Sequence, residues 1–170
     1  DQAWKEFEES GGYIKWASDL ARIPEEHGVT NVYGELGSTF ANSAVAHPRF
    51  CAAFIGTLVK GLGADHVVWG TDTVWYGSPQ WQIEAMRRLE VPEDMQKKYN
   101  LPALGGANSL TKQAIFGLNS ARIYGLSMNE ATNMPDLPNF SEDKIAGLAE
   151  QFREVGGGPS NKRFGYTRKA

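Results

Sequence analysis

The sequence predicts an α/β protein built on parallel strands, and two observations support this prediction. A segment with alternating apolar residues, 29–36 (VTNVYGEL), and a short apolar run, 67–69 (VVW), flank an amphipathic helical segment that begins at Pro48. The order strand, helix, strand within about 45 residues is typical of a right-handed βαβ unit. The apolar run is uniform rather than alternating, as in parallel strands that are covered on both faces.

Residues 2–23 are expected to form one helix, because apolar residues recur there at intervals of three and four between charged ones. Pro24 is expected to interrupt that helix, since proline lacks the N–H of the helical hydrogen-bond ladder. A turn ending at Gly28 then leads into the first strand.

The helix that begins at Pro48 has the clearest pattern, since proline suits the first helical turn and a glycine, Gly61 or Gly63, ends the run. Its apolar positions at helical spacing are Cys51, Phe54, Ile55, Leu58, Val59 and Leu62. This helix is expected to bury that face. The second strand, 65–72 (DHVVWGTD), follows directly.

The later elements are predicted from caps, prolines and periodicity. They begin with a loop at 73–78, a helix from Pro79 to Leu89 with Ser78 as N-cap, and a short helix at 92–99. A longer helix is expected at 108–126, with Gly125 as C-cap, and a last helix begins at Ser141. The apolar side of the helix at 108–126 consists of Leu110, Ala114, Ile115, Leu118 and Ala121. Residues 1–130 are expected to form the main unit. Residues 131–170 are expected to be a linker, that last helix and a Gly-rich, basic tail.

Composition excludes several classes of function. The net charge of −3 over 170 residues gives no basic footprint for nucleic acid. No apolar run reaches the roughly 18 residues that a membrane span requires. Cys51 is the sole cysteine, which excludes an internal disulfide and a metal cage built from cysteines. We therefore expect a soluble, cytoplasmic protein.

Asp72 is the main candidate for chemistry. It ends the second strand in Gly70-Thr71-Asp72, and parallel α/β folds place their catalytic groups at the carboxyl ends of strands. A carboxylate there can bind a metal ion or accept a proton from a metal-bound water. Alternatively, Asp72 caps the next turn, as Asp often does after a strand. Spacing alone leaves both interpretations open.

Three stretches together resemble a known family: 63–81 (GADHVVWGTDTVWYGSPQW), 31–40 (NVYGELGSTF) and 115–126 (IFGLNSARIYGL). Over roughly residues 25–130 the chain looks like the C-terminal part of the amidohydrolase-related family of metal-dependent hydrolases, which also includes decarboxylases of aromatic and related acids. The family forms eight-stranded β/α barrels with a divalent metal at the mouth. Its last strand ends in G-[ST]-D, and its final barrel helix resembles N-[AS]-A-R-[IL]-Y-G-L, as in 119–126 here.

The resemblance implies that Asp72 is a metal ligand or general base and that the metal is a divalent ion, with zinc preferred. It also implies that the first six strands and their metal-binding histidines precede Asp1, since such a barrel needs roughly 250 residues. The chain's own histidines do not fit the family's ligand positions: His27 precedes the first strand, His47 precedes a helix, and His66 lies at the far end of the second strand. One plausible ligand falls short of the three that catalytic zinc needs.

Further site candidates are weaker. Glu35, near the end of the first strand, could reach the barrel mouth or instead face solvent. Four residues of the loop after Asp72 are expected to line a substrate pocket, with the aromatic ones packing on a planar acid. They are Trp75, Tyr76, Ser78 and Gln80. An anchoring role for Trp81 and Trp75 is left open. Arg87-Arg88 could bind a substrate carboxylate as a bidentate fork, but their place late in a helix favours a solvated face or a partner for the helix dipole.

The sequence therefore predicts a fragment of a metal-dependent hydrolase or non-oxidative decarboxylase of a small acid, inactive alone. The expected partners are a small-molecule substrate and, as an open option, further copies of the chain in a homo-oligomer; nucleic acid and membrane are not expected. The alternative is a non-enzymatic α/β binding or assembly module in which Asp72 is a cap and the Trp-Tyr loop forms a partner surface.

Overall fold

The computed structural model of the chain describes residues 2–126 together with residues 128, 129, 134, 135, 146, 147, 150, 151 and 154. Its α-helices are α1 (Gln2–Glu9), α2 (Lys15–His27), α3 (Gly37–Ser43), α4 (Pro48–Leu62), α5 (Thr73–Tyr76), α6 (Gln80–Arg88), α7 (Glu93–Tyr99), α8 (Leu110–Gln113) and α9 (Asn119–Ile123). Its strands are β1 (Gly34–Glu35), β2 (Val67–Val68), β3 (Met128–Asn129) and β4 (Met134–Pro135). A 3₁₀ turn, η1 (Ala64–His66), precedes β2, and a π-helical turn, η2 (Ala114–Leu118), joins α8 to α9.

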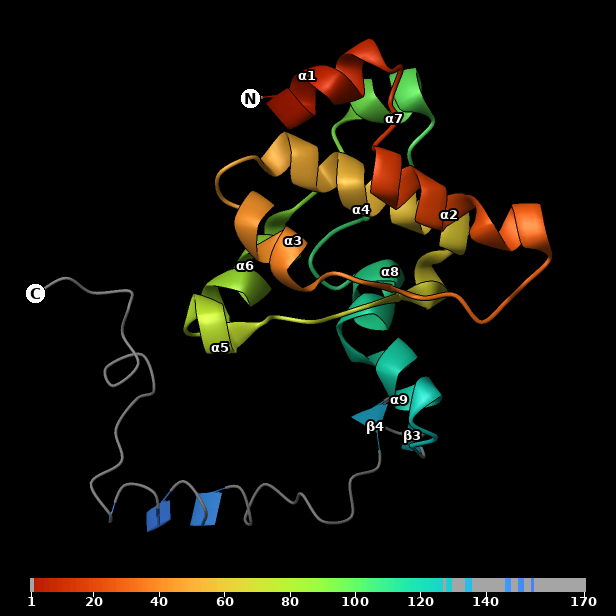
Figure 1. Cartoon of the computed structure of the whole chain (residues 1–170). Helices are drawn as coiled ribbons and strands as arrows, with labels where there is room; N and C mark the ends of the chain where they lie inside the picture. The colour runs from red at the N-terminus through yellow and green to blue at the C-terminus, as the bar shows by residue number, and fades with distance from the viewer. Residues whose placement is uncertain are drawn as a thin grey trace, which may run out of the picture.

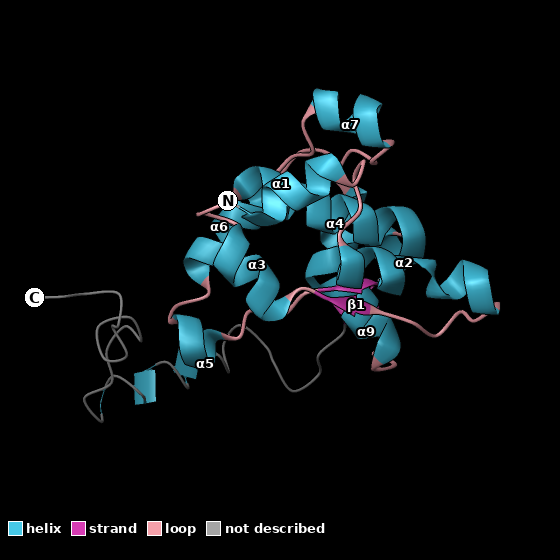
Figure 2. Ribbon diagram, turned by 45° about the horizontal axis from the view of Figure 1, so that its top comes forward, coloured by secondary structure: helices cyan, strands magenta, loops and turns pink. Residues whose placement is uncertain are grey.

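The described chain is helix-rich around a small parallel sheet. β1 and β2 pair in parallel, with Gly34 opposite Val67 and Glu35 opposite Val68. Figures 1 and 2 show the strand pair between α4 and α9, with α1 and α7 beyond α4. The parallel pairing predicted from the strand–helix–strand order is confirmed.

The strands are much shorter than predicted. Asp65 and His66 belong to η1 rather than to β2, and Asp72 turns the chain into α5 with a left-handed backbone at φ 48°. Upstream, residues 29–33 run as a loop, and the carbonyl of Thr30 is hydrogen-bonded by the His66 ring Nε2 at 3.0 Å. The ladder therefore extends over two residues of each strand.

The helix α4 forms the centre of the core, as its pattern predicted. Every predicted apolar position from Cys51 to Leu62 is buried, and so are Ala52 and Ala53 on its other sides. The helix ends at Leu62, before Gly63. Burial raises the pKa of the Cys51 thiol to about 12, in keeping with its place in the core.

The prediction of one helix over residues 2–23 is wrong. Two helices form instead, because Gly11 and Gly12 both adopt positive φ angles, at 71° and 99°, and break the run. Pro24 does not end α2 but lies inside its last turns. The helix ends at Gly28, whose left-handed backbone lets its N–H donate to the carbonyl of Pro24 at 2.9 Å.

Two short helices occupy segments that were not predicted to be helical. The first, α3, follows β1 directly, and the second, α5, takes up the start of the predicted loop at 73–78. The predicted cap of the following helix is also shifted, because Pro79 takes the N-cap position of α6 while the Ser78 hydroxyl accepts a hydrogen bond from Gln80 N at 3.4 Å.

The predicted helix at 108–126 is continuous from Leu110 to Ile123 but contains the π turn η2. The predicted C-cap is shifted by one residue, because Tyr124 is the C-cap and Gly125 follows it with φ 64°. Leu126 N donates to the carbonyl of Ala121 at 2.9 Å. The assignment of Leu110 to the apolar side is wrong, since this side chain, in the first turn, is 78% exposed.

Asn119 and Arg122 attach α9 to the start of β2. The buried Asn119 amide donates to the carbonyls of Ala64 and Val67 at 2.8 and 2.7 Å, and Arg122 donates to the carbonyl of Asp65 at 2.5 Å. These bonds fix the strand's amino end against α9. They give the 119–126 motif a structural role.

The predicted last helix from Ser141 and the basic tail lie almost wholly outside the described residues; residues 146, 147, 150, 151 and 154 are helical. The antiparallel pair β3–β4 joins the end of the predicted main unit to the start of the predicted linker, with Met128 opposite Pro135. Within the part of the chain that the structure describes, no helix has both the length and the apolar character to cross a membrane.

Candidate functional site

Asp72 lies just beyond the carboxyl end of β2, at the start of α5. Its backbone carbonyl accepts from Trp75 N at 2.9 Å and Tyr76 N at 3.3 Å, so the main chain opens the helix. Its carboxylate makes no capping bond; instead, Oδ2 accepts a hydrogen bond from the Ser38 hydroxyl at 2.5 Å. Asp tolerates the left-handed backbone that this turn requires. The carboxylate therefore lies against the end of β1 rather than over the helix that follows it.

Glu35 occupies the equivalent end of the neighbouring strand. Its Oε1 accepts from the backbone N–H of Gly37 at 3.0 Å. Burial, assisted by the negative charge of Asp72, raises the pKa of the Glu35 carboxyl, and the Gly37 N–H partly opposes this rise. The negative charge of Asp72 therefore acts on the Glu35 carboxyl at the end of the sheet.

Two glycines leave the space in which these carboxylates meet. A Cβ at Gly70 would lie 1.4 Å from Glu35 Oε1, so no other residue fits there without moving that side chain. A Cβ at Gly37 would lie 2.6 Å from Glu35 Oε2 and 3.1 Å from Asp72 Oδ2. Both carboxylates thus border the space beside Gly37, and the glycine of the Gly70-Thr71-Asp72 motif leaves room for the Glu35 side chain.

The loop candidates surround this pair less closely. The Tyr76 hydroxyl accepts from Asn42 Nδ2 at 2.9 Å, linking α5 to α3, and the Trp75 side chain is 70% exposed. Ser78 is half-buried and Gln80 exposed. Among the residues that the structure describes, no hydrogen bond joins any of these four to either carboxylate. The structure brings Glu35 and Asp72 together and leaves pocket lining by the loop a prediction.

Two supporting residues were not predicted from the sequence. Ser38 binds Asp72 from the start of α3, and Gln82, fully buried in α6, donates from Nε2 to the carbonyl of Thr71 at 2.7 Å. Gln82 therefore fixes the backbone immediately before Asp72. The Gly37-Ser38 pair after the first strand was the available signal for the first contact; the second depends on the packing of α6.

The histidines lie away from the carboxylate pair. His27 ends α2 and His47 precedes α4, both exposed, while the His66 ring stacks on Tyr33 with centroids 4.8 Å apart at the other end of β2. Over the described ranges, no three side chains of His, Cys, Asp or Glu are grouped to hold a metal ion. Glu35 and Asp72 offer two carboxylates to one space, a donor set that fits part of a divalent cation site.

Comparison with known proteins adds no relationship: no family model matches the chain, and neither does any curated protein or solved structure. The function is therefore inferred from the residues and their geometry.

Proposed function

We propose that the chain is the C-terminal portion of a metal-dependent enzyme of the amidohydrolase-related type, which hydrolyses or non-oxidatively decarboxylates a small, aromatic or related acid. The observation that supports this proposal is the pair of carboxylates, Glu35 and Asp72, at the carboxyl ends of adjacent parallel strands. Catalytic groups of parallel α/β enzymes lie at that edge. The Gly-Thr-Asp sequence at the end of β2 agrees with the family motif.

Asp72, with Glu35 beside it, is the residue that would hold a divalent cation. Two carboxylates on one space repel each other, and a cation between them would relieve that repulsion. When bound, such an ion would lower the pKa of a water and polarise the substrate. Catalytic zinc has about three protein ligands. We therefore place the remaining ligands on strands outside this chain and expect residues 1–170 to be inactive alone.

The chain's own residues supply orientation and a proton acceptor. The Ser38 hydroxyl occupies Oδ2 of Asp72, which leaves Oδ1 to contact a metal ion or to accept a proton from the attacking water. Gln82 holds the Thr71 carbonyl and so limits movement of the turn that carries Asp72. The Gly37 N–H keeps Glu35 at the same edge.

A non-enzymatic binding module is the second candidate, and the exposed Trp75 on α5 favours it, because large exposed aromatics often mark partner surfaces. In this alternative the carboxylate pair has only a structural role. Metal dependence separates the two candidates.

The test uses the complete protein that contains these residues, with the 170-residue chain beside it. We expect release of carbon dioxide from a panel of small aromatic acids, or hydrolysis of small esters and amides. A chelator should abolish this activity, added zinc or another divalent ion should restore it, and the 170-residue chain should show none. A complete protein that binds no metal and turns over none of these compounds contradicts the proposal and favours the binding module.

A further inference from the structure

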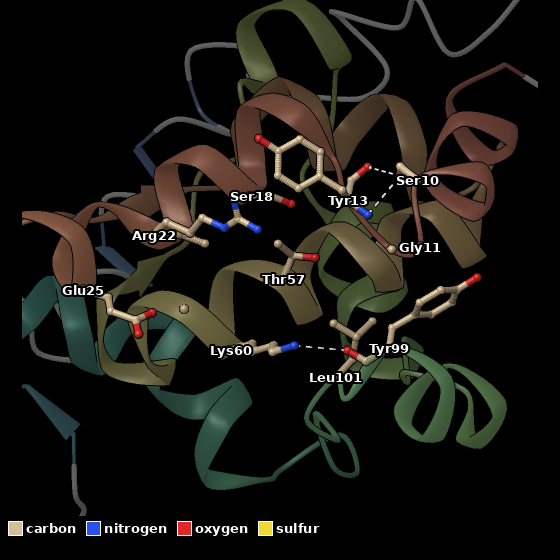
Figure 3. A pocket seen from close by; sticks show the side chains of 13 residues that line it. Ser10, Gly11, Tyr13, Ser18, Arg22, Glu25, Thr57, Lys60, Tyr99 and Leu101 are labelled. Carbon is tan, nitrogen blue, oxygen red and sulfur yellow. Dashed lines mark hydrogen bonds between the residues drawn. The ribbon is translucent and has the colours of Figure 1, made fainter.

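A cavity lies between α2 and α4, and none of its lining residues belongs to the Glu35–Asp72 site. Its volume of about 520 Å³ is within the usual range of small-molecule pockets. Figure 3 shows it bordered by α2, α4, the turn after α1 and the segment that follows α7. Its lining residues are Ser10, Gly11, Gly12, Tyr13, Ser18, Ala21, Arg22, Glu25, Thr57, Lys60, Gly61, Tyr99 and Leu101.

Arg22 brings a guanidinium to this cavity, and no carboxylate among the described residues pairs with it. Within residues 2–126 it forms no ion pair or hydrogen bond, and its contact is with the Tyr13 ring, whose centroid lies 5.1 Å from its Cζ. The Tyr13 hydroxyl donates to Asp19 instead. The five N–H donors of Arg22 are therefore available to an acceptor inside the cavity.

Thr57 provides a second unused polar group on the cavity's floor. The residue is 8% exposed, and its hydroxyl has no hydrogen-bond partner among the described residues. Figure 3 shows the Arg22 side chain extending toward Thr57. Two other buried hydroxyls belong to the lining: that of Ser18 accepts from Ile14 N at 2.9 Å, and that of Tyr99 has no hydrogen-bond partner among the described residues. Figure 3 shows the Tyr99 ring directed away from Arg22 and Thr57. A buried hydroxyl without a partner is costly, and a ligand oxygen would satisfy it.

The remaining lining defines the charge and the shape of the ligand. Lys60 adds a second positive charge to the lining, and its Nζ donates to the carbonyl of Tyr99 at 3.2 Å. Glu25 adds one negative charge, so the net charge of the lining is +1. Ala21 and Leu101 provide apolar wall. This combination favours a singly charged oxyanion with a short apolar body over a dianion.

We propose that the α2–α4 cavity binds a small monocarboxylic acid, with the carboxylate on Arg22 and the Thr57 hydroxyl and the apolar end against Ala21 and Leu101. The bond from a guanidinium to a carboxylate is charge-assisted and can be bidentate. This site is independent of the carboxylate pair at the strand ends. Neither its presence nor its absence changes the proposal for Asp72.

The test is an NMR titration of the ¹⁵N-labelled 170-residue chain with butyrate, in which the amide chemical shifts are measured at each butyrate concentration. Butyramide serves as the neutral control of the same shape, and inorganic phosphate as the dianion. We expect saturable butyrate shifts that include the amides of Arg22, Thr57 and Lys60. Arg22→Gln should weaken binding about tenfold or more, because a hydrogen bond to a charged group is lost. Thr57→Val, which keeps the side chain's shape, should weaken binding by a smaller factor.

Arg88→Gln is the matched charge control, since Arg88 lies on α6, 81% exposed and paired with Glu84. It should leave butyrate binding unchanged. Equal shifts with butyramide, equal effects of Arg22→Gln and Arg88→Gln, tighter binding of phosphate, or shifts confined to residues elsewhere would each overturn the proposal.

Discussion

In the full-length enzyme that we propose, replacing Asp72 by Asn is expected to lower turnover at least about 100-fold, the lower end of what a positioned proton acceptor contributes. The amide has the same shape and retains an oxygen for the Ser38 hydroxyl, so the turn into α5 should persist. It has no negative charge to hold a cation and accepts no proton at neutral pH. Steady-state kinetics with circular dichroism would measure the loss and verify the fold.

Asp65→Asn is the control for that variant, because Asp65 lies in η1, before the amino end of β2, whereas Asp72 follows its carboxyl end. Its carboxylate is 58% exposed and lies 3.1 Å from His66 Nδ1 and 3.7 Å from Arg122, an arrangement at the surface that contributes little to stability. We expect turnover within about twofold of the unmodified protein, since surface ion pairs are worth little. Equal turnover of the Asp72→Asn and Asp65→Asn variants would contradict the role of Asp72.

Gly61→Ala is expected to lower the free energy of unfolding by about 1–3 kcal/mol, the usual cost of an added methylene in a packed interior. A Cβ at Gly61 would lie 2.3 Å from the Ala21 carbonyl oxygen and 2.6 Å from the Ala21 Cβ. The first of these is a backbone atom, so relief requires α2 and α4 to move apart. This cost exceeds the helix-forming advantage of alanine, which is at most about 1 kcal/mol.

Gly117→Ala is the matched control, because a Cβ there would meet nothing within 4 Å. Its helical position should leave stability unchanged or raise it by about 0.5–1 kcal/mol. Urea denaturation of the unmodified chain, Gly61→Ala and Gly117→Ala measures the three midpoints. The midpoints report stability if the dependence of the unfolding free energy on urea concentration is the same in all three. Coincident midpoints for the Gly61→Ala and Gly117→Ala variants would refute the close approach of α2 and α4.

Local signals predicted the helices better than the strands. Pro48 and the apolar spacing from Cys51 onward placed α4 correctly because a helix satisfies its hydrogen bonds within its own segment. Strand length depends on a partner far along the chain, and here β1 and β2 face each other over two residues. The adjacent glycines at 11 and 12 were visible in the sequence, but the regular spacing across them favoured a single helix.

The two carboxylates of the site were predictable from the sequence, whereas the residues that hold Asp72 in place, Ser38 and Gln82, were not. Asp72 and Glu35 are marked by their places at the ends of predicted strands, and parallel pairing brings those ends together. The Ser38 contact joins residues 34 positions apart and depends on the left-handed turn at Asp72, which the sequence does not specify. The α2–α4 cavity arises from the packing of α2 on α4, so the sequence of neither helix predicts it alone.

The most direct test of the central claim is crystallography of the complete protein with anomalous diffraction at the zinc edge. We predict an anomalous peak about 2.0–2.2 Å from a carboxylate oxygen of Asp72, the usual distance for a zinc–carboxylate bond, with Glu35 facing the same ion. A metal centre formed without Asp72, or an active enzyme with no anomalous peak at the carboxyl ends of β1 and β2, would contradict it.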